Sequence, residues 1–148
     1  MTAHDLMTAQ PAVIAESDTI IAAATLMRTR GVGMLPVVKD LAGMRLVGII
    51  TDRDIVVRHV ALDHGAEAKI HEHMTRAPLV TVAPDASLEV VAQRMAQAQV
   101  RRVPVVDGRG AVIGVIAQAD LATAVGPGNP ELVERVLEAI SRPGALVH

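Results

Sequence analysis

The chain has 148 residues, of which 51% are hydrophobic and 20% charged, a balance that indicates a folded globular protein rather than a disordered one. Its net charge is −2 and it contains no Phe, Tyr or Trp, so it lacks the basic surface and the stacking rings on which most nucleic-acid binders rely. It contains no cysteine, which excludes disulfides, thiolate metal sites and a cysteine nucleophile.

The N-terminus, MTAHDLMTAQ, has no apolar stretch of the kind that forms the centre of a signal peptide. No apolar run in the chain approaches the ~20 residues that a membrane-spanning helix needs. We therefore expect a cytoplasmic protein whose partners include neither nucleic acid nor a membrane.

The first half of the chain predicts a strand, a helix, two strands and a second helix. A short apolar strand at 12–14 is followed by acidic residues that suit a helix N-terminus. Strands at 34–38 and 45–50 flank Gly43, which predicts a hairpin, and the second helix opens at Thr51. The first helix carries apolar residues at a spacing of three and four, namely Ile20, Ala23, Ala24 and Met27.

The second half repeats this order, with matching segments roughly 67 residues apart. EHMT at 72–75 matches DLMT at 5–8, RRVPVV at 101–106 matches GMLPVV at 33–38, and GVIAQADLA at 114–122 matches GIITDRDIV at 48–56. The same elements are therefore predicted again: a strand at 79–82, a helix with Leu88, Val91, Ala92 and Met95 on one face, strands at 102–106 and 111–116, and a helix from Ala117.

These elements predict an α/β (α+β) fold made of two tandem motifs, at 1–62 and 63–126, each with a small three-stranded sheet and two helices. Units of this size leave much apolar surface uncovered when alone. We therefore expect the two motifs to pack about a pseudo-twofold axis, with two symmetry-related clefts. A C-terminal helix extension at 127–148 is predicted from Pro130 at its first position and an apolar stripe, and it packs either on its own body or on a partner subunit.

The pattern Met-Thr, strand, helix, Pro-Val-Val, hairpin and Gly-x-x-Thr-x-x-Asp, in two copies, resembles the CBS domain pair, also called a Bateman module. The resemblance covers about residues 3 to 125, and the whole chain is similar to stand-alone bacterial CBS-pair proteins. It implies clefts that take adenosine compounds such as AMP, ADP, ATP or S-adenosylmethionine as regulatory ligands, with no required cofactor. It also implies a homodimer, and it does not imply catalysis.

The resemblance assigns roles to the residues of the Gly-x-x-Thr-x-x-Asp phrase. Thr51 is expected to contact phosphate or ribose, and Asp54 to accept hydrogen bonds from the ribose hydroxyls. These roles suit the chemistry, because a carboxylate accepts from two neighbouring hydroxyls and a helix N-terminus attracts phosphate. The second repeat keeps Asp120 but has Ala117 in place of the threonine, and Ala119 in place of Arg53.

A second difference between the repeats precedes the Pro-Val-Val segment. The second repeat has Arg101 and Arg102 there, whereas the first has Gly33 and Met34. Basic residues at this position in CBS pairs often reach the phosphates of the ligand held by the other repeat. We therefore expect Arg101, Arg102 and Arg53 to supply positive charge to the ligand of Thr51 and Asp54, while the other cleft is poorly equipped.

Two alternatives stay open at this point. Thr-x-x-Asp is also a helix capping box, in which case the Ala117 substitution loses only a cap worth ~1 kcal/mol. The chain would then be a degenerate CBS pair that acts as an interaction or assembly module without a nucleotide. In either case the signal must pass to another protein, which the sequence does not name.

Other site chemistry is weakly supported. His71-Glu72-His73 offers two histidines but no third ligand at a fixed spacing, so no metal site is predicted. No serine lies in a Gly-x-Ser-x-Gly setting and no phosphate-binding P-loop is present. We therefore predict no catalytic residues and a protein that is not an enzyme.

Overall fold

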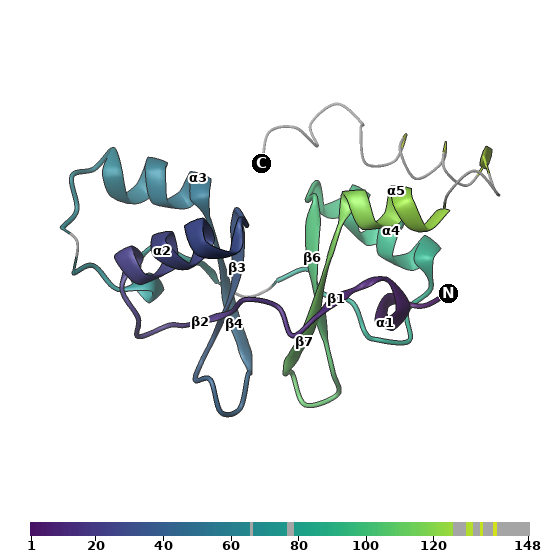
Figure 1. Ribbon diagram of the computed structural model, residues 1–148, viewed down its shortest axis with the longest axis horizontal. Coiled ribbons are helices and arrows are strands. Elements are labelled where there is room, and N and C mark those ends of the chain that lie inside the picture. Colours follow the sequence, from purple (N-terminus) through teal and green to yellow (C-terminus); the bar gives the residue numbers. More distant parts are fainter. Residues whose placement is uncertain (66, 77–78, 126–129, 132–133, 135–137, 139–148) are drawn as a thin grey trace. The chain divides into compact units, whose positions relative to one another are not determined.

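The structure is a computed structural model, and it describes residues 1–65, 67–76 and 79–125 together with 130, 131, 134 and 138. It divides into two compact units (Figure 1). The first-repeat unit contains Ala12–Leu79 and the hairpin residues Arg109–Val112, and the second-repeat unit contains Met1–Pro11, Val80–Gly108 and the described residues from Ile113 onward.

The first-repeat unit is built on a four-stranded sheet with strand order β2-β3-β4-β5. Strand β2 runs parallel to β3, and the other neighbours are antiparallel. Figure 1 shows the long β3–β4 hairpin with the helices α2 and α3 beside it. In chain order the elements are β2 (Ile14–Ala15), α2 (Ile20–Arg30), β3 (Met34–Val38), β4 (Leu46–Thr51), α3 (Asp52–Asp54), the π-helix η1 (Ile55–Val60), the 3-10 helix η2 (Ile70–Glu72) and β5 (Thr75–Arg76).

Helix α2 illustrates why these residues fold as they do. Thr19 caps its N-terminus by accepting a hydrogen bond from the Ala22 N–H at 3.1 Å. Gly31 ends the helix at φ 66°, a left-handed conformation that glycine adopts without steric cost. The apolar face of the helix packs into a core with residues from the sheet and η2, including Ile20, Ala23, Met27, Leu35, Ile50 and Ile70.

The second-repeat unit has a three-stranded sheet with order β1-β7-β6. An isolated parallel bridge from Val82 to Val105 stands where the first repeat has the β2–β3 pairing. Its core gathers Val91, Met95, Val103, Val105, Ile116 and Leu121. The elements are α1 (Ala3–Leu6), β1 (Thr8–Ala9), α4 (Leu88–Ala98), β6 (Arg102–Val106), β7 (Val112–Ala117) and α5 (Gln118–Val125).

The Met-Thr segment that opens each repeat in the sequence pairs with a strand of the other repeat. Strand β1 pairs antiparallel with β7, with Ala9 opposite Gly114, and β5 pairs antiparallel with β4, with Arg76 opposite Gly48. The two glycines admit these segments: a Cβ on Gly48 would lie 2.5 Å from the Met74 Sδ, and one on Gly114 would overlap the Met7 side chain. The shared glycine of the two repeats is therefore a packing requirement as well as a sequence signature.

Most of the predicted elements are confirmed. The strands at 34–38 and 102–106 and the helices from Ile20 and Leu88 begin where the sequence places them. The expectation of three strands per sheet is too low for the first-repeat unit, because β5 adds a fourth. The short helix α1 is not predicted, although Thr2 and Asp5 form a capping box around it.

The two compact units are discontinuous in sequence, and the division into motifs at 1–62 and 63–126 stays a prediction. Residues 1–11 lie in the second-repeat unit, since β1 pairs there, and residues 63–79 lie in the first-repeat unit with β5. The predicted C-terminal helix at 127–148 lies outside the described residues for most of its length. Among the described residues, no helix has the length and apolar character to cross a membrane.

Candidate functional site

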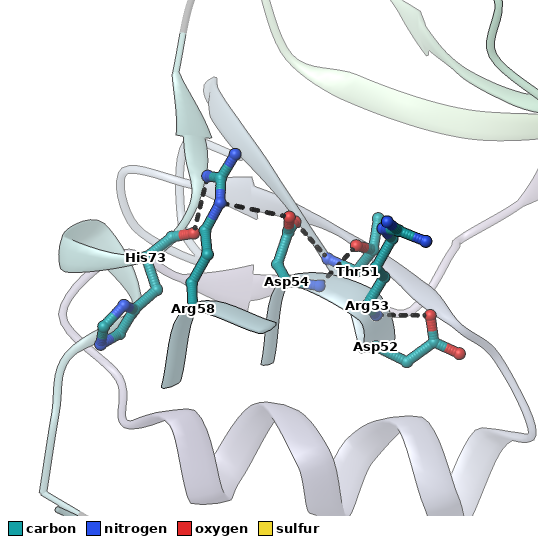
Figure 2. Close-up of polar contacts among 6 residues, drawn as sticks. All are labelled: Thr51, Asp52, Arg53, Asp54, Arg58 and His73. Atoms are coloured by element: carbon teal, nitrogen blue, oxygen red, sulfur yellow. Dashed lines mark hydrogen bonds and ion pairs between the residues drawn. The ribbon is translucent and has the colours of Figure 1, made fainter. Parts of the chain in front are cut away.

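Thr51 and Asp54 form a complete capping box at the start of α3 (Figure 2). The Thr51 backbone N–H donates to the Asp54 Oδ2 at 3.0 Å, and the Asp54 N–H donates to the Thr51 Oγ1 at 3.1 Å. The turn comes directly after β4, so the sheet fixes where the two side chains lie. The capping interpretation of Thr-x-x-Asp is therefore correct as geometry, and it leaves the ligand-binding interpretation untested.

The second oxygen of Asp54 faces a cation. Its Oδ1 lies 3.8 Å from the Nε of Arg58, one turn further along the helix. This distance allows electrostatic attraction but is too long for a hydrogen bond. A carboxylate oxygen carries two lone pairs, so Oδ1 retains the capacity to accept hydrogen bonds from a bound hydroxyl group.

Arg58 also reaches the end of η2. Its Nη1 donates to the backbone carbonyl of His73 at 3.4 Å, and Figure 2 shows the His73 imidazole on the side away from the guanidinium. The two residues between Thr51 and Asp54 in sequence add further charge to this turn. Asp52 and Arg53 are both exposed, and the Arg53 N–H donates to the Asp52 Oδ1 at 2.8 Å.

The corresponding turn of the second repeat is only half capped. The Ala117 N–H donates to the Asp120 Oδ2 at 2.7 Å, as in the first repeat, but alanine supplies no hydroxyl to cap the helix. The Gln118 N–H donates to the Arg101 carbonyl at 2.8 Å, and the equivalent bond in the first repeat runs from Asp52 to Gly33 at 2.9 Å. The backbones of the two turns therefore match, and the differences lie in the side chains.

An open pocket of about 350 Å³ lies at this second turn. Two of its lining residues, Arg101 and Arg102, are exposed, and neither makes an ion pair within the described part of the chain. The rest of the lining is uncharged, so the pocket is electropositive. The lining residues are Arg101, Arg102, Ala117, Gln118, Ala119 and Ala122.

The first repeat differs in charge at the matching place. Gly33 lies beside the Asp52 carboxylate, whose Oδ2 would be 2.9 Å from a Cβ built on that glycine. The first repeat therefore presents a carboxylate where the second presents arginines. A phosphate is favoured at the second turn and disfavoured beside Asp52.

The predicted site residues thus fall into two sets. The structure brings together Thr51, Arg53 and Asp54 in one turn, and it brings Arg101 and Arg102 beside Ala117 in the pocket at the turn of Asp120. The prediction that the arginines serve the ligand of Thr51 and Asp54 stays a prediction.

Three histidines of the first-repeat unit form a cluster that was not predicted from the sequence. His59, His64 and His73 each offer one ring nitrogen, and these nitrogens all lie within 4.8 Å of one another. The sequence had paired His73 with His71, which is not in the cluster. The two further members come from η1 and the turn after it, and a spacing of five residues between them gave little signal. A hydrogen bond from the His64 N–H to the His59 carbonyl at 3.1 Å makes this spacing compact.

Burial affects the ionisation of His73. His59 and His73 are each only 5% exposed. Burial, followed by the proximity of His64 and His59, lowers the pKa of His73 below its usual value. The neutral imidazole that results is the form that binds a metal ion.

Comparison with known proteins identifies the family. The sequence model of the CBS domain family matches this chain twice, over residues 3–59 and 69–126. The CBS domain-containing protein YhcV of Bacillus subtilis is 42% identical over 118 residues, which cover 80% of this chain and 81% of YhcV. Hypoxic response protein 1 of Mycobacterium tuberculosis is 34% identical over 146 residues, which cover 98% and 97% of the two chains.

Solved structures agree with this assignment. The crystal structure of Hypoxic Response Protein I with two coordinated zinc ions has a TM-score of 0.75 at 35% identity, covering 83% of this chain and 98% of that one. CBSX2 in complex with AMP, from Arabidopsis thaliana, has a TM-score of 0.72 at 27% identity, with 84% and 95% covered. The CBS pair of MJ0100 with 5-methylthioadenosine and S-adenosyl-L-methionine has a TM-score of 0.71 at 31% identity, with 85% and 96% covered. The chain therefore belongs to the CBS domain family, as a tandem pair of CBS motifs.

Proposed function

We propose that this CBS pair is a regulatory module that binds an adenosine nucleotide and passes the binding signal to another protein through a change in conformation or assembly. The observation that carries the proposal is the Thr51–Asp54 turn, whose carboxylate keeps an oxygen able to accept from a ribose. Similar CBS pairs bind adenosine compounds, namely AMP in CBSX2 and 5-methylthioadenosine with S-adenosyl-L-methionine in MJ0100. The role is regulatory rather than catalytic.

Asp54 and Thr51 are proposed to bind the nucleoside end of the ligand. Asp54 is 15% exposed, so its side chain is held in place by its neighbours yet remains accessible. Its Oδ2 is occupied by the Thr51 N–H, which orients the carboxylate and leaves Oδ1 for the ribose hydroxyls. Thr51 adds a hydroxyl next to the N-terminus of α3.

Arg101 and Arg102 are proposed to bind phosphate groups. Their pocket contains no carboxylate in its lining, and hydrogen bonds between guanidinium and phosphate are among the strong, charge-assisted type. Arg53 and Asp120 are proposed as further contacts of the two turns. A phosphorylated ligand, AMP, ADP or ATP, is favoured over S-adenosylmethionine, because the arginines would repel its sulfonium.

The module is proposed to act as a homodimer. Helix η1 carries Val56, Val57 and Val60, which are 58%, 50% and 62% exposed, and large apolar side chains grouped on one helix are typical of protein contacts. The downstream partner would then respond to a ligand-dependent change in the dimer. Such a change is limited by the difference in ligand affinity between the two states.

The test is a titration of AMP, ADP, ATP and S-adenosylmethionine by calorimetry, supported by dye-based thermal shift because the chain has no tryptophan. A ligand at one hundred times its Kd adds ~2.7 kcal/mol of stability. We expect Asp54→Asn, which keeps the size of the side chain, to weaken binding. Arg30→Met, which removes an exposed arginine of α2, serves as the control for the arginine substitutions that follow. A double-mutant cycle of Asp54→Asn with Arg101→Met and Arg102→Met shows whether the two turns act on one ligand.

A second function is favoured by one observation. The Thr51–Asp54 box satisfies its own hydrogen bonds without any ligand, as expected of a degenerate CBS pair that serves only in assembly. If none of the four ligands binds at millimolar concentration, the nucleotide proposal is wrong and the assembly function replaces it.

A further inference from the structure

The three-histidine cluster of His59, His64 and His73 plays no part in the proposed nucleotide contacts. All three residues belong to the first-repeat unit, so the cluster is complete within one compact body. We propose that these histidines form a binding site for one divalent cation of the zinc type, with a coordination position left open for a water or another ligand.

The distances suit a small cation. Zinc binds histidine nitrogen at about 2.0–2.1 Å in tetrahedral geometry, which places the ligand nitrogens roughly 3.3 Å apart. The His64 Nδ1 and the His73 Nε2 are 3.1 Å apart, and the third nitrogen lies within 4.8 Å of both. Side-chain rotations that close the longest of these separations to ~3.3 Å place all three nitrogens at bonding distance of one ion.

The hydrogen bonding of the cluster is incomplete without a cation. His64 and His73 form a ring-to-ring contact in which one nitrogen can donate to the other. The Nδ1 of His59, a residue that is 95% buried, has no partner, and it is the one buried side-chain nitrogen or oxygen in the described chain of which this is true. Buried polar atoms are almost always paired, so the orphaned nitrogen is a sign that a ligand completes the site.

The rings are held close together by the backbone. His59 lies in the π-helix η1, a form of helix that occurs frequently at functional sites. Asp63 at φ 55° turns the chain back, so that His64 lies near His59. His73 ends η2, where its N–H donates to the Ile70 carbonyl at 2.9 Å. The ring centroids of His59 and His64 lie 5.2 Å and 4.8 Å from that of His73.

The ligand set indicates the class of metal. Three imidazoles with no carboxylate in the cluster suit Zn²⁺, Ni²⁺ or Cu²⁺, whereas Mg²⁺ and Ca²⁺ require oxygen ligands. The competing explanation is that the histidines pack as aromatic filler in a chain without Phe, Tyr or Trp.

The experiment titrates the metal-stripped full chain with Zn²⁺ against a chromophoric chelator, and repeats the titration with Co²⁺ to read the coordination geometry from its visible spectrum. We expect one ion per chain and at least about a tenfold loss of affinity in His64→Gln. His64 is exposed, so this variant should keep the wild-type circular dichroism and apo-protein Tm.

The control is His71→Gln, the same substitution at a histidine outside the cluster and only two residues from His73. It should bind zinc as the wild type does. Wild-type affinity in His64→Gln, or no zinc uptake by the wild type at tens of micromolar, overturns the proposal.

Discussion

Asp54 and His73 are joined by a single side chain, the guanidinium of Arg58 (Figure 2). One nitrogen lies 3.8 Å from the Asp54 carboxylate and another donates to the His73 carbonyl at 3.4 Å. The proposed ribose ligand and the proposed metal ligand therefore share a connection. Binding at either site can bias the position of the other site's residue, and any such coupling must be reciprocal.

We predict a small coupling, because Arg58 is 51% exposed and such ion pairs contribute only ~0.2–1 kcal/mol. Saturating Zn²⁺ should change the Kd of the nucleotide by up to about fivefold, and Arg58→Met should abolish the change while both ligands still bind. Calorimetric titrations with and without zinc measure it. An equal zinc effect in Arg58→Met and wild type would show that the coupling does not pass through this residue.

The incomplete cap of the second repeat gives a prediction about stability. Ala117→Thr places a hydroxyl where the Asp120 N–H can donate to it, and the reverse bond from the Ala117 N–H is already present at 2.7 Å. Completing a capping box should add ~0.5–1 kcal/mol, or a rise in Tm of about 1–4 °C for a chain of this size.

Thr51→Ala is the matched variant, since it removes the same hydroxyl from the first repeat and should lower stability by a similar amount. Urea denaturation of the wild type, Ala117→Thr and Thr51→Ala measures these differences in the free energy of unfolding. If Ala117→Thr is no more stable than the wild type, the backbone of the second turn does not accept a cap.

The two packing glycines should differ in their response to substitution. A Cβ on Gly48 would meet the Met74 Sδ at 2.5 Å and also the Thr75 carbonyl, backbone of the paired strand β5, at 2.9 Å. The three nearest atoms to a Cβ on Gly114 all belong to the Met7 side chain, and the nearest of them is the flexible Sδ. Overpacking costs roughly 1–3 kcal/mol. We expect Gly48→Ala at the high end and Gly114→Ala at the low end, as measured by chemical denaturation.

Met7→Ala in the Gly114→Ala background tests the cause. Removing the Met7 Sδ and Cγ relieves the two closest contacts there, so the double variant should lose less stability than the sum of the single changes. Strict additivity would mean that the Met7 Sδ and Cγ are not the source of the strain.

The elements that depend on the local spacing of apolar residues could be predicted from the sequence. Leu88, Val91, Ala92 and Met95 are all buried in α4, as their spacing indicates, and the paired turns at Thr51 and Ala117 begin as expected. The sequence did not predict the exchange of the Met-Thr segments, because a two-residue strand has no periodicity and its partner is set by a glycine far along the chain.

The histidine cluster escaped prediction for a related reason. His59 and His64 have no helical or strand spacing, and they meet His73 only because a π-helix and a left-handed Asp63 fold the segment back. Such features arise from tertiary packing rather than from local preference. The sequence therefore presented His71 and His73 as the nearest pair, although only His73 takes part.

The arginine pair predicts how affinity should depend on phosphate number. Arg101 and Arg102 are exposed residues of an otherwise uncharged pocket, so their contribution should appear as a preference for phosphorylated ligands over adenosine. Each hydrogen bond to a charged group contributes ~1.5–3 kcal/mol, so the loss of even one such bond in the Arg101→Met, Arg102→Met double variant weakens ATP binding by about 10- to 150-fold.

Adenosine is the internal control of that experiment, because it lacks the groups that the arginines would contact. Its affinity should change little in the double variant, and the difference between adenosine and ATP should shrink as salt is raised, since exposed charges are screened. Equal weakening of adenosine and ATP would mean that the substitutions distort the pocket instead of removing phosphate contacts. An unchanged ATP affinity would remove the arginines from the site and leave the nucleotide to the Asp54 turn alone.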